Sequence, residues 1–178
     1  IVIYGTSIVQ GGCASRPGMS YPAIMGRILD RTVINLGFSG NGQAEEEIAD
    51  LLSELNPSVY VLDYCPNLDK ERICHRTEPF VNTLRNVHPD IPIVLVENIT
   101  YQNQSYISSI NRTNIEKNLE LRAAYNRMRA DGIKHLLYIR GDQLLGSDGE
   151  ATVDGIHPTD LGFIRMAESI TPILSSLL

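Results

Sequence analysis

The stretch Ile1-Val2-Ile3-Tyr4-Gly5-Thr6-Ser7 opens the chain as an apolar run that ends on a glycine, a threonine and a serine. A short apolar run bounded by such residues is typical of a buried β-strand. Glycine at the end of the strand permits a sharp turn, so the serine that follows can expose its hydroxyl group. We therefore expect Ser7 at the carboxyl end of the first strand, where ligand sites of parallel sheets are found.

Four further apolar runs predict buried strands, at residues 32–36, 59–64, 91–97 and 136–139. Segments with the apolar spacing of helices lie between and after these runs, at residues 21–28, 48–55 and 121–128. Candidate N-cap residues support this division, and they are Ser20, Thr113 and Thr159. The alternation predicts an α/β protein, a three-layer α/β/α sandwich with a five-stranded parallel sheet of the flavodoxin-like kind.

The size and charge of the chain limit the classes of protein to consider. Its 178 residues with 43% hydrophobic content are enough for one domain, which we expect to span residues 1–178. A net charge of -6 without a long Lys/Arg run argues against nucleic acid as a partner. No apolar run is long enough for a membrane-spanning helix, so we expect no membrane insertion.

The cysteine and acidic residues do not suggest a metal site. Three cysteines without C-x-x-C spacing weigh against a disulfide framework and against structural zinc. The acidic residues between Asp142 and Asp154 lack the spacing of a calcium-binding loop. We therefore expect no metal ligands and no cofactor.

The segment Asp154-Gly155-Ile156-His157 supplies the groups that a serine nucleophile requires. A serine hydroxyl needs a base within hydrogen-bond reach, and His157 is the candidate for Ser7. An aspartate three residues before the histidine can bond the other ring nitrogen, which fixes the tautomer and stabilises the imidazolium. The predicted catalytic residues are thus Ser7, His157 and Asp154.

An oxyanion hole can be assembled from the segments that follow the first three strands. The backbone N–H of Ser7 is one candidate donor, and the backbone N–H of Gly40 is another because glycine lets bare backbone approach a substrate. The side-chain amide of Asn67, held behind Pro66, is the third. Each of these residues alone could equally be a turn or loop residue, so the prediction depends on their joint order along the chain.

Four blocks of the sequence resemble the SGNH hydrolases, also called GDSL-type esterases, over nearly the whole chain. The blocks are Tyr4-Gly5-Thr6-Ser7, Asn35 to Gly42, Asp63 to Asn67 and Asp154-Gly155-Ile156-His157-Pro158. The resemblance implies the SGNH hydrolase fold, the nucleophile and oxyanion residues named above, and an acyl-enzyme mechanism without a cofactor. Thr6, Cys65, Pro66 and Leu68 depart from the usual residues of the blocks, which places the chain in a divergent branch.

The divergent branch that the chain resembles often carries a β-sandwich domain ahead of the hydrolase domain. Because the sequence begins inside its first strand, we expect an additional N-terminal domain in the full-length protein. The branch also often accompanies carbohydrate-handling domains, so the expected reaction is removal of a small acyl group, such as acetyl, from a carbohydrate or similar small ester. Such an activity would suggest a secreted or periplasmic protein, although the sequence itself leaves the compartment open.

Two kinds of alternative remain open at this stage. A lysophospholipase or thioesterase of the same fold would use the same residues on a longer acyl chain, and a catalytically inactive carbohydrate-binding module would keep only the cleft. A nucleotide or flavin binder is disfavoured, because the first strand is followed by no phosphate-cradling glycine pattern. Four residues are predicted to line the substrate pocket: Arg16, Tyr21, Glu97 and Tyr101.

Overall fold

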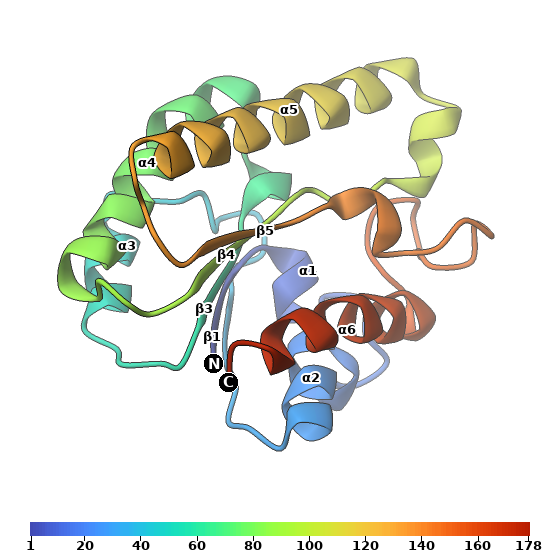
Figure 1. Ribbon diagram of the computed structural model, residues 1–178. Helices are drawn as coiled ribbons and strands as arrows, with labels where there is room; N and C mark the ends of the chain where they lie inside the picture. The colour runs from blue at the N-terminus through green and yellow to red at the C-terminus, as the bar shows by residue number, and fades with distance from the viewer.

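A computed structural model describes residues 1–178 as a three-layer α/β/α sandwich around one parallel sheet (Figure 1). The strands lie in the order β2-β1-β3-β4-β5, and every neighbouring pair is parallel. The strands are β1 (Val2–Gly5), β2 (Ile34–Gly37), β3 (Tyr60–Asp63), β4 (Ile93–Val96) and β5 (Leu136–Ile139). The predicted fold class and the five strands are confirmed.

Two groups of helices cover the two faces of the sheet, as Figure 1 shows. One face is covered by α3 (Glu46–Ser53), α4 (Lys70–Val87) and α5 (Ser108–Ala130). The other is covered by α1 (Ser7–Gln10), α2 (Tyr21–Leu29) and α6 (Asp160–Ser175). The side chains of each strand alternate between these two cores, since neighbouring residues of a strand point to opposite faces.

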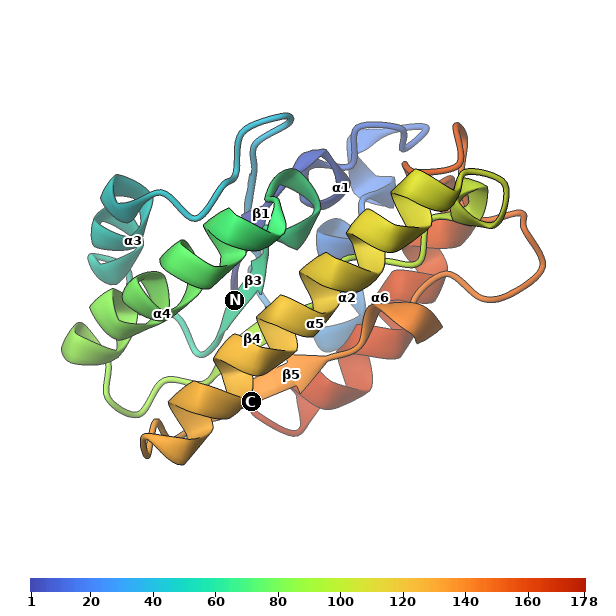
Figure 2. The ribbon, with the colours of Figure 1, turned by 90° about the horizontal axis from the view of Figure 1, so that it is seen from above.

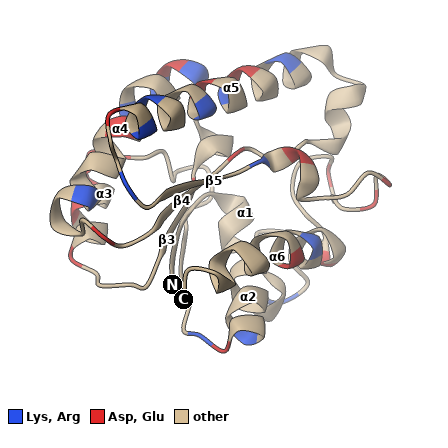
Figure 3. Cartoon of the chain, viewed as in Figure 1, with Lys and Arg blue, Asp and Glu red and all other residues tan.

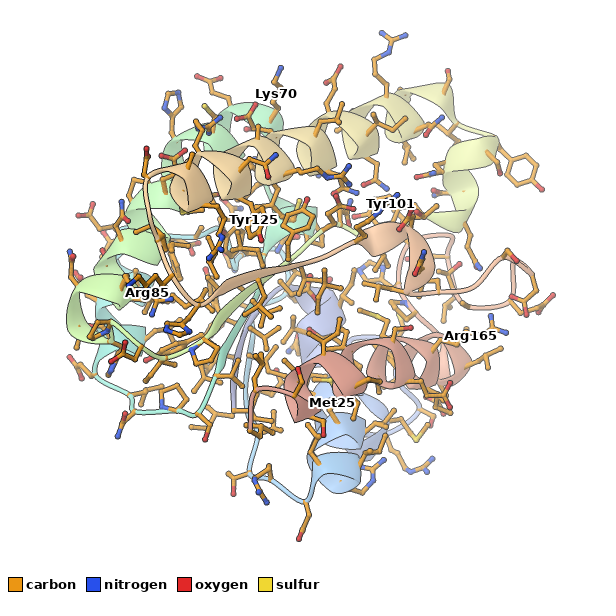
Figure 4. The ribbon with its side chains drawn as sticks, viewed as in Figure 1. Met25, Lys70, Arg85, Tyr101, Tyr125 and Arg165 are labelled. Atoms are coloured by element: carbon orange, nitrogen blue, oxygen red, sulfur yellow. The ribbon has the colours of Figure 1, made fainter.

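The long helix α5 crosses over β4 and β5 when the molecule is seen from above (Figure 2). On the opposite face α2 and α6 pack together, and Met25 lies between them (Figure 4). Four short 3₁₀ helices join these elements: η1 (Pro17–Met19), η2 (Cys65–Asn67), η3 (Gln102–Ser105) and η4 (Gly141–Gln143). No helix is both long and apolar enough to span a lipid bilayer.

Two of the three predicted helix caps are confirmed. Ser20 precedes α2, and the Oγ1 of Thr159 accepts a hydrogen bond of 3.2 Å from Gly162 N at the start of α6. The prediction for Thr113 is wrong, because α5 already begins at Ser108. Two residues separate the end of η3 from the helix α5, which begins at Ser108.

The second strand is less buried than predicted. Ile34 on β2 is 41% exposed, whereas the residues of β1 and β3 are buried. The reason is the strand order, since β2 lies at the sheet edge and pairs with β1 alone.

Charged residues are spread over the outer surfaces of the helices and loops (Figure 3). Acidic and basic side chains alternate along α4 and α5, where Arg127 forms ion pairs with Glu78 and Glu120.

Candidate active site

Ser7, His157 and Asp154 form a continuous hydrogen-bonded relay at the carboxyl end of the sheet. The Ser7 Oγ and His157 Nε2 atoms lie 3.0 Å apart, and His157 Nδ1 and Asp154 Oδ2 lie 2.7 Å apart. The side chains of His157 and Asp154 are 32% and 49% exposed, so the relay is open to solvent along one side. The three residues that sequence analysis named as catalytic therefore meet in space.

The turn after β1 presents the Ser7 hydroxyl. Thr6 is the N-cap of α1, and its Oγ1 accepts a hydrogen bond of 3.2 Å from Ile8 N, which fixes the first turn around Ser7. As the first residue of this helix, Ser7 has a backbone N–H without an acceptor inside the helix. Gly5 is required because a Cβ there would lie 2.2 Å from the carbonyl oxygen of Asp63 on β3.

A small hairpin-like loop presents His157. An antiparallel bridge joins Thr152 to Pro158, and Val153 N donates to the carbonyl of His157 over 2.8 Å. Gly155 lies at the tip with φ +87°, and a Cβ there would collide with the side chain of Asn103. The loop thus closes on itself between β5 and α6, and the turn at Gly155 brings Asp154 back to His157.

Asp154 is held as a carboxylate by its own loop. Its Oδ1 accepts the backbone N–H groups of Ile156 and His157 over 2.9 and 2.7 Å, while its Oδ2 faces the imidazole. Partial burial acts to raise the pKa of Asp154, but these hydrogen bonds outweigh it and lower the pKa to about 2. An ionised Asp154 favours the tautomer in which His157 Nδ1 carries the proton and Nε2 is free to accept one from Ser7.

The segments that carry Gly40 and Asn67 adjoin each other next to β1. Asn67 Nδ2 donates a hydrogen bond of 3.0 Å to the carbonyl of Asn41, which leaves its second amide proton unassigned. Gly40 has φ +71° and open space around its Cα, so its backbone is bare. Gly42 lies so close to Gly5 that a Cβ would meet the Gly5 carbonyl at 2.0 Å. The predicted oxyanion segments therefore border the turn that holds Ser7.

The loop with Gly40 is anchored by polar contacts that sequence analysis missed. The Tyr4 hydroxyl accepts from Ala44 N over 3.0 Å and donates to Glu45 Oε2 over 2.5 Å. Arg76 donates to the carbonyl of Gln43 over 2.8 Å. The tyrosine that ends the first apolar run was a signal for this contact, because a buried tyrosine hydroxyl needs a polar partner.

Tyr21 does not line a substrate pocket, which corrects the prediction. Its side chain is fully buried, and its hydroxyl donates a hydrogen bond of 2.8 Å to Asp63 Oδ2 at the end of β3. Burial raises the pKa of Asp63 to about 7, against a smaller opposing effect of the Tyr21 bond. The physical reason is that the first turn of α2 packs on the sheet directly behind the site.

Glu97 is also a structural residue and not a pocket residue. Its side chain is 3% exposed, and one carboxylate oxygen accepts from Arg122 over 2.5 Å and from Tyr138 over 2.6 Å. The other oxygen accepts from Gly141 N over 2.9 Å. These contacts tie β4 to α5 and β5, so the basic partner of Glu97 is Arg122, whereas Arg140 pairs with Asp142.

Arg16 and Tyr101 lie closer to solvent than these two residues. Arg16 is exposed and stands next to Ser15, whose backbone N–H and hydroxyl both donate to Asp160 at the start of α6. Tyr101 lies between α5 and the segment of residues 146–149 and borders a cavity on each side (Figure 4). Of the four predicted pocket residues, Tyr101 is the one that lines a cavity beside the His157 loop.

Acidic and thiol groups outside the relay are engaged separately. Asp148 pairs with Arg165 over 2.6 Å, away from Asp154. All three cysteines are free thiols, and no group of three or more His, Cys, Asp or Glu side chains converges as a metal site would require. A separate cavity of about 340 Å³ between α3 and α4 contains none of the relay residues.

The chain has a parallel sheet of this order, and a serine at the end of its first strand bonds a histidine from the loop before the last helix. Together these features define a class, the α/β proteins that have the site geometry of a serine hydrolase. Within that class, the model of the GDSL-like lipase/acylhydrolase family matches residues 1–175. The chain belongs to this family. The resemblance seen in the four sequence blocks is thereby confirmed.

Solved structures agree with this assignment. The chain is 40% identical to a protein from Bacteroides ovatus described as a GDSL-like lipase, with a TM-score of 0.96 over 99% of this chain and 52% of that one. It is 20% identical to a salicylyl-acyltransferase from a tetracycline biosynthetic pathway, with a TM-score of 0.85 over 99% and 54%. A family two carbohydrate esterase from Clostridium thermocellum, in complex with cellohexaose, is 18% identical, with a TM-score of 0.73 over 98% and 63%.

The chain thus spans about half the length of the first two of these proteins. The likeness to the last two shows a shared fold. No curated protein matches the sequence.

Proposed function

We propose that this chain is a serine ester hydrolase that works through an acyl-enzyme at Ser7. The observation that carries the proposal is the relay of Ser7, His157 and Asp154, with its distances of 3.0 and 2.7 Å. The 3.0 Å distance suits proton transfer from the Ser7 hydroxyl to the imidazole, and the 2.7 Å distance is that of a hydrogen bond between the imidazole and the Asp154 carboxylate. Membership of the GDSL-like lipase/acylhydrolase family supports the same reaction class.

The reaction proceeds in two steps. Ser7 Oγ attacks the ester carbonyl while His157 Nε2 takes the hydroxyl proton, and Asp154 stabilises the imidazolium. His157 then returns the proton to the leaving alcohol, and the acyl group remains on Ser7. In the second step His157 takes a proton from water, and the resulting hydroxide adds to the acyl carbonyl. The bond to Ser7 Oγ then breaks, His157 returns the proton to Ser7 Oγ, and the acid leaves.

The oxyanion formed in each step needs hydrogen-bond donors that are already in place. We assign this role to the backbone N–H groups of Ser7 and Gly40 and to the Nδ2 of Asn67. The support is that a Cβ at Gly40 would meet no atom within 4 Å and that Asn67 has an amide proton to spare. Removing one such donor costs about 2.7–4 kcal/mol of transition-state stabilisation in other hydrolases.

The substrate we propose is a carbohydrate, or a similar small alcohol, that carries a short acyl group such as acetyl. The support is indirect: the cavity between Tyr101 and residues 146–149 is lined mainly by polar residues, and a carbohydrate esterase shares the fold. An additional N-terminal β-sandwich domain in the full-length protein stays a prediction.

The proposal is tested by hydrolysis of p-nitrophenyl acetate, butyrate and octanoate by the wild-type chain and by Ser7→Ala. We expect acetate to be the best substrate and the variant to lose at least about 10³-fold in kcat. Mass spectrometry after rapid quenching should find the acyl group on Ser7. Octanoate as the best substrate would favour the lysophospholipase or thioesterase alternative, and equal inactivity of both proteins would favour the inactive binding module.

A further inference from the structure

A small cavity opens directly beside the relay, and its volume is about 260 Å³. Ile156, the neighbour of His157, forms one wall, and the first turns of α5 form the opposite wall. The lining residues are Asn98, Tyr101, Ser109, Ile110, Thr113, Asn114, Lys117 and Ile156.

The same cavity reaches the segment of the predicted oxyanion hole. Lys117 Nζ donates a hydrogen bond of 2.9 Å to the carbonyl of Pro66, the residue before Asn67. The cavity therefore lies between the loop that carries His157 and Lys117, the residue that binds the backbone next to Asn67. The lining includes Ile156 but neither Ser7 nor His157, so the cavity is a neighbour of the relay and not a part of it.

Asn98 contributes an acceptor that the protein leaves unpaired. This residue is fully buried, and its Oδ1 has no hydrogen-bond partner. The orientation of the Asn98 amide is fixed by Asn114. The Nδ2 of Asn114 donates to the carbonyl of Ile99 and to Gln104 Oε1, so its Oδ1 is the atom that faces Asn98. That oxygen can only accept, so the Asn98 atom 2.8 Å from it is the donor Nδ2. Asn118 also clamps the backbone of Asn98 on both its N–H and its carbonyl. A buried acceptor without a partner is unfavourable unless a ligand or water supplies a donor.

Lys117 contributes the complementary donors. Its ammonium group has three protons, of which the bond to Pro66 uses one, and it forms no ion pair with a carboxylate. Burial lowers its pKa, which reflects a position away from bulk water. The lining of the cavity thus includes a residue with spare donors, Lys117, and a residue with an unpaired buried acceptor, Asn98, together with the apolar side chains of Ile110 and Ile156.

We propose that this cavity is the subsite for a sugar ring of the substrate, read by Lys117 and Asn98. One ring hydroxyl oxygen accepts from the ammonium of Lys117, and a hydroxyl proton is donated to Asn98 Oδ1. Tyr101 and the two isoleucines contact the apolar faces of the ring. A polyol satisfies both unpaired groups at once, whereas a carboxylate satisfies only the cation and an alkyl chain satisfies neither.

The inference rests on the proposed esterase function and specifies its substrate. The test compares kcat/KM for monoacetylated methyl glycosides of glucose, mannose and xylose with kcat/KM for p-nitrophenyl acetate, which has no sugar. In Lys117→Met we expect the ratio of glycoside to nitrophenyl ester to fall about tenfold or more, through a higher KM. Lys117→Gln retains a donor for Pro66 and should lower the ratio as well.

Lys134→Met is the matched control, because Lys134 is exposed and precedes the amino end of β5, far from this edge of the sheet. Its ratio should equal that of the wild type. The subsite is refuted if the Lys117 variants leave every ratio unchanged, or if wild type hydrolyses p-nitrophenyl acetate but none of the glycosides.

A binding experiment separates failure of the subsite from failure of the proposed function. Saturation-transfer NMR with the free methyl glycosides requires no hydrolysis, so it can be carried out on Ser7→Ala. Binding that is lost in the double variant Ser7→Ala, Lys117→Met supports the subsite even if no ester is hydrolysed. Absence of binding to Ser7→Ala itself would overturn the subsite while leaving the esterase proposal intact.

Discussion

Two aspartates at the same edge of the sheet have opposite environments. Asp154 lies in an exposed loop and accepts three hydrogen bonds from His157 and Ile156, and its pKa falls to about 2. Asp63 ends β3 in the core, where the Tyr21 hydroxyl is its hydrogen-bond donor, and its pKa rises to about 7. Burial therefore dominates at Asp63, and hydrogen bonding dominates at Asp154.

Under the proposed mechanism, the difference distinguishes the carboxylate that acts in the relay from one that is structural. A group that must stabilise an imidazolium has to be ionised at neutral pH, and the loop of Asp154 provides for that with backbone N–H groups. Asp63 is adapted to bridge α2 and the sheet, for which a partly protonated carboxyl is sufficient. Asp63 ends the third strand and Asp154 lies in the loop after the fifth. Their positions along the chain alone therefore do not tell which of the two acts in the relay.

The largest effect is expected from Asp154→Asn. The amide would present an N–H to His157 Nδ1 and so favour the wrong imidazole tautomer, and kcat for p-nitrophenyl acetate should fall about 10³–10⁴-fold. Asp142→Asn is the matched control, since Asp142 is another exposed carboxylate of this edge that pairs with Arg140. Equal activity of Asp154→Asn and the control would remove Asp154 from the relay.

An intermediate effect is expected from Asp63→Asn, on stability and not on the chemical step. Asp63 keeps its proton up to a pH of about 7 in the folded state but only up to 3.8, its ordinary value, in the unfolded chain. The unfolded chain therefore binds fewer protons between these values, so the wild-type protein loses stability as the pH rises through this window, by at most about 1.4 kcal/mol per pH unit.

The asparagine variant lacks this titration. Its free energy of unfolding relative to wild type should therefore increase from pH 4 to pH 7, by up to about 4 kcal/mol, as measured by urea unfolding at several pH values. Asp50→Asn, a change at an exposed position of α3, should show no such trend. A difference between Asp63→Asn and wild type that stays constant with pH would contradict the assigned burial effect.

The smallest effect is expected from Asp160→Ala, at a third aspartate of this edge. Asp160 accepts 2.9 and 2.5 Å hydrogen bonds from Ser15, which link the segment after the nucleophile turn to the helix that follows His157. Loss of this link should loosen the placement of His157 against Ser7 and lower kcat by less than about tenfold, with little change in KM.

Ser15→Ala removes one of the two bonds and should have a smaller effect on kcat than Asp160→Ala. A change in KM without a change in kcat would show that Asp160 acts on substrate binding and not on the placement of the base. Thermal unfolding of both variants separates a local effect from a loss of stability.

Much of the fold and the core of the site could be predicted from the sequence, because both depend on local patterns. The apolar runs locate the strands, and parallel alternation brings Ser7 and the segments of Gly40 and Asn67 to one edge. The short spacing between Asp154 and His157 allows them to share one turn.

The contacts across the layers could not be predicted, since they join side chains whose directions no periodicity reveals. Tyr21 has the polar tip of a pocket residue, yet its helix turns that tip toward Asp63. Glu97 binds Arg122, 25 positions away on α5, whereas Arg140 pairs with Asp142. Asn98 becomes notable only when the contacts of Asn114 and Asn118 with it are known.

The contact between Ser7 and His157 joins positions 150 residues apart. The ribosome releases the nucleophile first, and the base follows only after all five strands have been made. Domains fold as the chain emerges, and β1 must wait for β3 before it is flanked on both sides. A nascent or prematurely terminated chain thus carries Ser7 without His157. Under the proposed mechanism, the Ser7 hydroxyl gains its base only when synthesis has passed the final loop.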